Sequence, residues 1–204
     1  IVQWLTRAVE FAELHPKINK LIETSSLADA LLAHEEQSKD VIAGQIRKLN
    51  LPFVYAIKEN RNPYYVSAAR EMLLNPSVDS WMYQKGIEYL WSVGKPESVE
   101  VFQELYDHKG PDDYKARMRL CEALIHFKDP RGLPDALAVM ADSFGKAPES
   151  PDEKVLKANL KLNEDKRGQA LEVLERANDE MLFAAVLKQI HSENIGMRRA
   201  ILHA

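Results

Sequence analysis

The sequence predicts an all-α protein in which helical hairpins stack into a right-handed superhelix, or solenoid. Apolar residues recur at helical spacing along nearly the whole chain, and strand-like alternation is almost absent. In addition, Pro63, Pro96 and Pro130 lie 33 and 34 residues apart. Self-similarity at this scale is typical of helical repeat proteins, because each repeat buries its apolar face against its neighbours.

The residues around the three prolines also correspond. Each proline can open a helix, where no backbone donor is needed. An apolar residue follows each proline by three positions: Val66, Val99 and Leu133. The segment KGIEYLWSVGKP (85–96) aligns with RLCEALIHFKDP (119–130), and a weaker unit restarts at residue 164. We therefore expect about four helical hairpins.

Residues 1–61 are expected to form a helical cap or irregular earlier repeats. A first helix should end before Pro16, and a short second one should run through Leu21. Ser26 is the predicted N-cap of the next helix, because Asp29 follows it by three residues. A helix over 41–49 comes next, and Pro52 opens a further turn or two. An end cap is needed because each repeat leaves an apolar flank for its neighbour.

Residues 62–192 are expected to form the repeats and residues 193–204 a capping helix, all within one continuous domain. Each repeat contributes a first and a second helix. The predicted first helices cover 63–74, 97–108, 131–143 and 165–176. The predicted second helices cover 78–93, 113–127, 151–162 and 178–190. The KDP stretch at 128–130 is then a turn between repeats, with Arg131 and Gly132 at the start of the next helix.

Two segments resemble HEAT repeats of the armadillo-like class. DPRGLPDALAVMAD (129–142) is similar to the turn and first helix of a short HEAT repeat, and DDYKARMRLCEAL (112–124) is similar to the second helix. Arg117 matches an arginine that the family carries early in that helix, whereas Tyr83 stands at the equivalent position one repeat earlier. The resemblance implies a superhelix whose second helices line a concave surface. Such motifs are more specific for fold than for function.

Composition excludes several classes of function. The net charge of −4 is spread evenly, so no segment has the basic excess that nucleic-acid binding requires. No apolar run reaches the ~20 residues of a membrane span, so we expect a soluble protein without membrane insertion. Cys121 is the only cysteine, which fits a reducing, cytoplasmic location. The chain begins with Ile1, which leaves open a removed leader or a longer parent protein.

The sequence offers little evidence for catalysis. His34-Glu35 resembles the His-Glu dyads of HEAT-like di-iron hydroxylases, but those enzymes need several dyads and this chain has one. Cys121 occupies the repeat position that Ile87 holds one unit earlier, which favours a core thiol over a nucleophile. We expect no catalytic residue, no bound metal and no cofactor. An enzyme of the metal-dependent or lyase type on this scaffold is the alternative.

The second helices carry a possible interaction surface. Lys85 aligns with Arg119, and Glu88 with Glu122, in a mixed-charge stripe bordered by aromatic residues, a residue type enriched in interface hot spots. These charges could equally be ordinary i,i+3 surface pairs, with the aromatic side chains packed between helices. Reversing Glu88 and Glu122 to lysine is expected to leave stability nearly unchanged. The candidate partner-binding residues are Trp81, Tyr83, Gln84, Lys85, Glu88, Arg119, Glu122 and His126.

The sequence therefore predicts a non-catalytic scaffold that binds a partner peptide or helix along its concave surface. The partner would be another protein or another domain of the parent chain. A structural helical domain within a larger multidomain protein is a further alternative.

Overall fold

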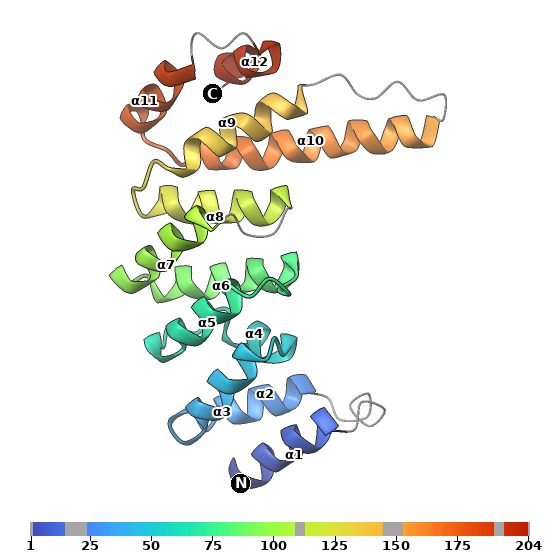
Figure 1. Ribbon diagram of the computed structural model, residues 1–204, viewed down its shortest axis with the longest axis vertical. Helices are drawn as coiled ribbons and strands as arrows, with labels where there is room; N and C mark the ends of the chain where they lie inside the picture. The colour runs from blue at the N-terminus through green and yellow to red at the C-terminus, as the bar shows by residue number, and fades with distance from the viewer. Residues whose placement is uncertain (1, 15–23, 109–112, 145–152, 190–193, 204) are drawn as a thin grey trace. The chain divides into compact units, whose positions relative to one another are not determined.

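The computed structural model describes residues 2–14, 24–108, 113–144, 153–189 and 194–203. All regular structure within these ranges is helical, which confirms the prediction of an all-α protein (Figure 1). The contacts between helices group the chain into two compact units, Ile1–Pro111 and Asp112–Ala204. Each unit has its own core of buried apolar side chains.

The first unit consists of two rows of helices that contact each other. The helices α1, α3, α5 and α7 contact one another in succession, and so do α2, α4 and α6. Their bounds are α1 Val2–Leu14, α2 Thr24–Leu32, α3 Glu35–Arg47, α4 Leu51–Ile57, α5 Val66–Leu73, α6 Ser80–Val93 and α7 Pro96–Asp107, with a 3-10 helix, η1, at Pro63–Tyr65. The core of the unit is filled by side chains that face between the rows, including Leu31, Ile42, Phe53, Met72, Leu90 and Phe102.

The second unit is arranged around α9 (Gly132–Ser143). This helix packs against α8 (Tyr114–His126), α10 (Glu153–Glu175), α11 (Asp179–Gln189) and α12 (Ile195–His203). Two glycines allow the closest approaches to its partners. A Cβ on Gly132 would lie 2.8 Å from the Cα of Cys121, and one on Gly196 would lie 2.3 Å from the carbonyl oxygen of Ala141.

The KDP stretch forms the turn between α8 and α9, as the sequence predicts. Lys128 has a left-handed backbone (φ 66°) just after the helix. Its N–H donates to the Ile125 carbonyl at 3.0 Å, and the Asp129 N–H donates to Leu124 at 2.9 Å. This pattern is a Schellman motif. The Asp129 carboxylate then accepts hydrogen bonds from the backbone and the guanidinium of Arg131, so both groups are used in building the turn.

Helix bounds in the repeat region agree with the sequence prediction to within two residues from α6 to α9, and differ elsewhere. The helix predicted over 41–49 is α3, which starts at Glu35 and ends at Arg47. Ser26 lies inside α2, because that helix starts at Thr24. Pro63 opens the 3-10 helix η1, and α5 begins at Val66. The predicted helices 151–162 and 165–176 form the single helix α10, because no proline or glycine separates them to end the first. The predicted short helix through Leu21 lies outside the described residues.

Candidate functional site

An apolar pocket of about 370 Å³ lies on the row α2–α4–α6 of the first unit. It is open to solvent, and one of the described residues in its wall carries a carboxylate. The lining residues are Asp29 from α2, Leu51, Pro52, Tyr55 and Ala56 from α4, and Trp81 from α6. A volume of this size is in the range of small ligand-binding pockets, and it exceeds what one buried apolar side chain needs.

Local sequence places the pocket walls. Pro52 lies in the first turn of α4, where it needs no donor, and Tyr55 follows on the same face three residues later. The Asp79 carboxylate caps α6 by accepting a hydrogen bond from the Met82 N–H at 2.7 Å, which starts the helix at Ser80. Trp81 therefore lies in the first turn of α6, at the edge of the pocket.

Tyr55 and Trp81 are unusually exposed for large aromatic side chains. Tyr55 is 47% and Trp81 51% exposed. Two lysine ammonium groups lie against their rings: Lys58 Nζ is 4.2 Å from the Tyr55 centroid, and Lys85 Nζ is 4.8 Å from the Trp81 centroid and 5.8 Å from that of Tyr55. Cation–π contacts of this kind hold the rings in place at the surface. Contact with Tyr55 is also the main reason why the pKa of Lys58 is raised.

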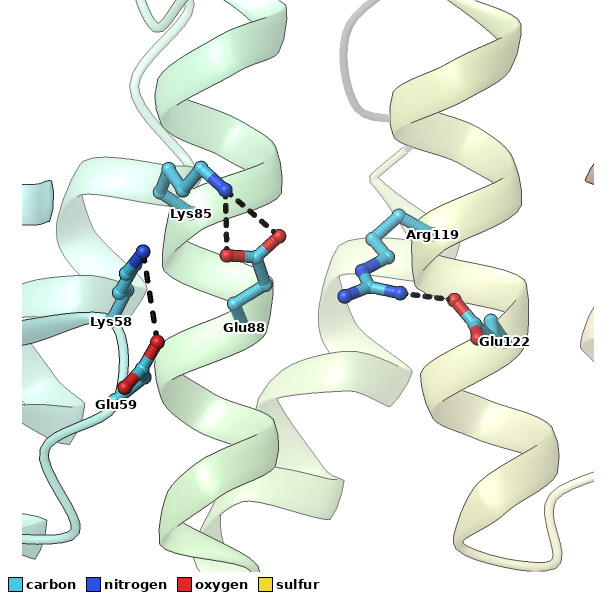
Figure 2. A network of polar contacts seen from close by, with 6 residues as sticks. All are labelled: Lys58, Glu59, Lys85, Glu88, Arg119 and Glu122. Atoms are coloured by element: carbon cyan, nitrogen blue, oxygen red, sulfur yellow. Dashed lines mark hydrogen bonds and ion pairs between the residues drawn. The ribbon is translucent and has the colours of Figure 1, made fainter.

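Each of these lysines also pairs with a carboxylate. Lys85 donates to both oxygens of Glu88, at 3.0 and 2.8 Å, and Lys58 lies 3.6 Å from Glu59 (Figure 2). Trp81, Lys85 and Glu88 are spaced i, i+4, i+7 and so share one face of α6. The positive charges at the pocket are therefore matched by charges of the same chain.

The loop that carries Lys58 is held by a group of polar contacts. Glu35 Oε1, at the start of α3, accepts hydrogen bonds from the side-chain amides of Asn60 and Asn62 at 3.2 and 3.0 Å. From α6, the Tyr89 hydroxyl donates to the Asn62 carbonyl at 2.5 Å, and the Ser92 hydroxyl donates to the Asn60 carbonyl at 2.9 Å. These contacts fix the end of α4 against α6, and with it the pocket.

Buried tyrosines adjoin this loop. Burial raises the pKa of both the Tyr65 and Tyr89 hydroxyls above the ordinary value of 10.0, and the nearby Glu35 carboxylate adds to the increase for Tyr65. The Tyr65 hydroxyl nevertheless lacks the geometry of a hydrogen bond to Glu35 or to any other described group. Glu35 is thus a support for the loop, and its neighbour His34 is exposed at the start of α3.

The five predicted partner-binding residues on α6 differ in accessibility. Trp81 lines the pocket, Lys85 and Glu88 lie beside it, and Gln84 is partly exposed on the same helix. Tyr83 is only 1% exposed and belongs to the core of the first unit. Its side chain is therefore not available to a partner, in line with the alternative that the aromatic residues pack between helices.

The other three predicted residues lie on α8 of the second unit. Glu122 is 5% exposed, and its carboxylate accepts from Arg119 at 2.5 Å and from Arg176 at 2.7 Å. Figure 2 shows the Arg119 guanidinium directed at this carboxylate. His126 is exposed at the end of α8, with its ring edge-on to Phe127. The expectation that Glu122 could be reversed without loss of stability does not fit this buried ion pair.

Arg117, the residue that supported the family resemblance, pairs with Asp135 between α8 and α9. The equivalent Tyr83 is also directed inward in its own unit, so this repeat position is structural in both cases. Cys121 lies beside this pair. Burial raises the pKa of its thiol to about 12, which leaves it protonated and a poor nucleophile at neutral pH.

Tyr55, Lys58 and Asp29 were not among the partner-binding residues predicted from the sequence. They come from α2, from α4 and from the residue that follows α4, all in the segment 1–61, where the repeat pattern gives no alignment. The only local signal was the proline-led aromatic sequence at 52–55. Their position next to Trp81 depends on the contact of α4 with α2 and α6.

Within the described ranges, no three His, Cys, Asp or Glu side chains gather as metal ligands would. The helices in these ranges also include none with the length and apolar character of a membrane span. No protein-family model, curated protein or solved structure matches the chain.

Proposed function

We propose that the chain is a non-catalytic protein-interaction module whose first unit binds an apolar side chain of a partner peptide or helix. The observation that carries this proposal is the pair of exposed aromatic rings, Tyr55 and Trp81, at an apolar pocket of about 370 Å³. Tyrosine and tryptophan are enriched among the residues that contribute most binding energy at interfaces. The described residues that line the pocket include no nucleophile paired with a base.

The physical basis is burial of apolar surface. Full burial of a leucine or phenylalanine side chain contributes about 1.5–3 kcal/mol. Three helices form the walls of the pocket, and Lys58 and Lys85 hold the rings of Tyr55 and Trp81 in position. Binding therefore costs little side-chain conformational entropy in the pocket. One anchor of this kind supports a weak, specific contact, and flanking contacts along α6 would add to it.

The wider architecture that we propose is a HEAT-like solenoid. Support comes from the 33- and 34-residue proline spacing and from the two rows of successively contacting helices in the first unit. In such an arrangement the row α2–α4–α6 corresponds to the second helices, which line the inner surface of a superhelix. The pocket lies on this row, where a bound segment would contact several helices at once.

The test is selection of binding peptides from a displayed random library on the full-length chain. Peptides that occupy the pocket should bind the wild type and lose binding to the Trp81→Ala variant. Trp4→Ala is the matched control, because Trp4 is a 70% exposed tryptophan of the same unit on α1. Thermal melts of both variants check that the fold is kept. Failure to select any peptide that distinguishes the two variants would overturn the proposal.

A structural helical domain is the second candidate, and one observation in the second unit favours it. Several large apolar side chains of α11 and α12 are exposed: Phe183, Leu187, Ile195 and Leu202. Side chains of this kind are covered when a helical domain packs against further protein. Replacing Phe183 and Leu202 by serine should then leave the melting temperature unchanged and improve the solubility of the isolated chain. A lowered melting temperature would show instead that they stabilise the unit itself.

A further inference from the structure

The charges at the pocket indicate which kind of partner it accepts. Lys85 is paired with Glu88, and Lys58 with Glu59. The Asp29 carboxylate, in contrast, is exposed in the pocket wall and has no hydrogen bond or ion pair with any residue that the structure describes. Of the three carboxylates at the pocket, Glu59 and Glu88 are each paired with a lysine, whereas Asp29 has no cation partner among the described residues.

The surroundings of Asp29 are apolar. Its neighbours in the pocket wall are Leu51, Pro52 and Ala56 together with the two aromatic rings. A carboxylate beside apolar surface is only partly solvated once a ligand covers it, so a partner without a matching cation would leave it unpaired. A partner that carried its own carboxylate there would be repelled, which makes the site selective by charge.

We infer that the partner segment carries a basic residue, arginine or lysine, next to the apolar side chain that enters the pocket. The inference rests on the proposed function, because it concerns the same pocket. The apolar side chain packs against Tyr55 and Trp81, and the cation pairs with Asp29. Arginine suits this position better than lysine, because its planar guanidinium can bond a carboxylate with two N–H groups.

The net charge of the first unit points the same way. Residues 1–50 sum to −1 and residues 51–110 to −2. An acidic unit attracts basic segments during encounter, and this attraction weakens as salt screens it. The pocket thus combines an apolar contact that is insensitive to salt with a charge contact that is sensitive to it.

The experiment uses the library-selected peptides of the preceding section. Their sequences should combine an apolar residue with an arginine or lysine nearby. One selected peptide is then synthesised in three forms, with the basic residue kept, changed to glutamine or changed to glutamate. Affinities are measured for the full-length wild type and for its Asp29→Asn and Asp29→Lys variants.

Asp29→Asn should lower the affinity for the basic peptide about two- to fivefold at low salt, as expected for the loss of one exposed ion pair. At high salt the affinities of the variant and the wild type should become equal. Asp29→Lys should lower the affinity for the basic peptide further. This variant should instead prefer the peptide with glutamate, because its lysine can pair with that carboxylate. Glu100→Gln is the matched control. It removes an exposed carboxylate of α7 that is not part of the pocket, and should leave the affinity unchanged.

The outcomes separate this inference from the proposed function. One outcome is that the selected peptides need Trp81 but show no preference for basic residues, and bind Asp29→Asn as tightly as the wild type. That outcome would overturn the inference and leave the proposed function intact. Selected peptides rich in acidic residues would also overturn it. Absence of any Trp81-dependent peptide would overturn the proposed function itself.

Discussion

The Glu122 carboxylate contacts the Arg176 guanidinium at 2.7 Å, which joins α8 to the residue that follows α10. Its other oxygen accepts from Arg119 at 2.5 Å. A carboxylate this deeply buried between two cations stabilises the folded state only while both charges are matched. Removing or reversing it leaves guanidinium groups facing each other in partly buried surroundings.

We therefore predict that Glu122→Lys lowers the free energy of unfolding by at least about 2 kcal/mol, and Glu122→Gln by about 1 kcal/mol. Denaturant unfolding of the full chain measures both. Glu88→Lys is the matched control at the corresponding repeat position, where the acid is partly exposed and pairs with Lys85 (Figure 2). It should change stability by less than about 1 kcal/mol. Equal effects at the two positions would contradict the difference in burial.

This pair also shows what the sequence could and could not indicate. The 34-residue spacing aligned Glu88 with Glu122, and the bounds of the helices that carry them agree with the prediction. It could not show that Glu122 is buried and Glu88 partly exposed, because burial depends on the neighbouring helices. The second cation, Arg176, ends the predicted first helix 165–176, and no local pattern connects it with Glu122.

Helix positions were predictable for local reasons. Asp79 and Asp113 cap α6 and α8 through their own side chains, and Pro96 begins α7. Such signals act over a few residues and can be recognised in the sequence. The pocket was not predictable, because Tyr55 and Trp81 become neighbours only through packing of α4 against α6. The arrangement as a solenoid stays a prediction.

The close approach of α8 and α9 at Gly132 provides a second test. A methyl group there would lie 2.8–2.9 Å from backbone and Cβ atoms of Cys121, which cannot move without shifting the helix. We predict that Gly132→Ala destabilises the chain by about 1–3 kcal/mol. Gly168→Ala is the control, because nothing lies within 4 Å of a Cβ in that helical position. It should stabilise by about 0.4–1 kcal/mol. Similar effects of the two substitutions would contradict the contact.

The thiol of Cys121 should be unreactive in the folded chain and become reactive on unfolding. Its burial raises the pKa from 9.0 to about 12, so at pH values between these the unfolded chain loses the thiol proton and the folded chain keeps it. The unfolded state is thereby favoured, and stability falls as the pH rises above about 9. Below pH 9 both states are protonated and the thiol contributes no pH dependence.

Two measurements check the thiol prediction. Labelling with a thiol reagent at neutral pH should be slow in buffer and fast in denaturant. The decline of stability above pH 9 should be shallower in Cys121→Ala than in the wild type, while the contribution of Tyr65 and Tyr89 remains in both. Rapid labelling of the native chain, or identical alkaline slopes, would contradict the burial of Cys121.

The turn between α8 and α9 gives the last prediction. Lys128 holds a left-handed backbone at φ 66°, a conformation that costs a residue with a Cβ about 1–2 kcal/mol and glycine little. Its side chain is exposed, so removal of the side chain sacrifices no packing. Glycine loses more conformational freedom on folding, which offsets part of the gain. We predict that Lys128→Gly raises the free energy of unfolding by about 0.5–1 kcal/mol.

The matched control is Lys161→Gly, the same substitution at an exposed position inside α10, where the backbone is helical. It should lower stability by about 0.5–1 kcal/mol, because glycine is a poor helix former. Urea unfolding of both variants and the wild type measures the difference. Changes of opposite sign in the free energy of unfolding would support a left-handed backbone at Lys128. Both substitutions replace an exposed lysine by glycine, and they differ in the backbone conformation at the substituted position. Destabilisation by both would show that the turn does not require this conformation.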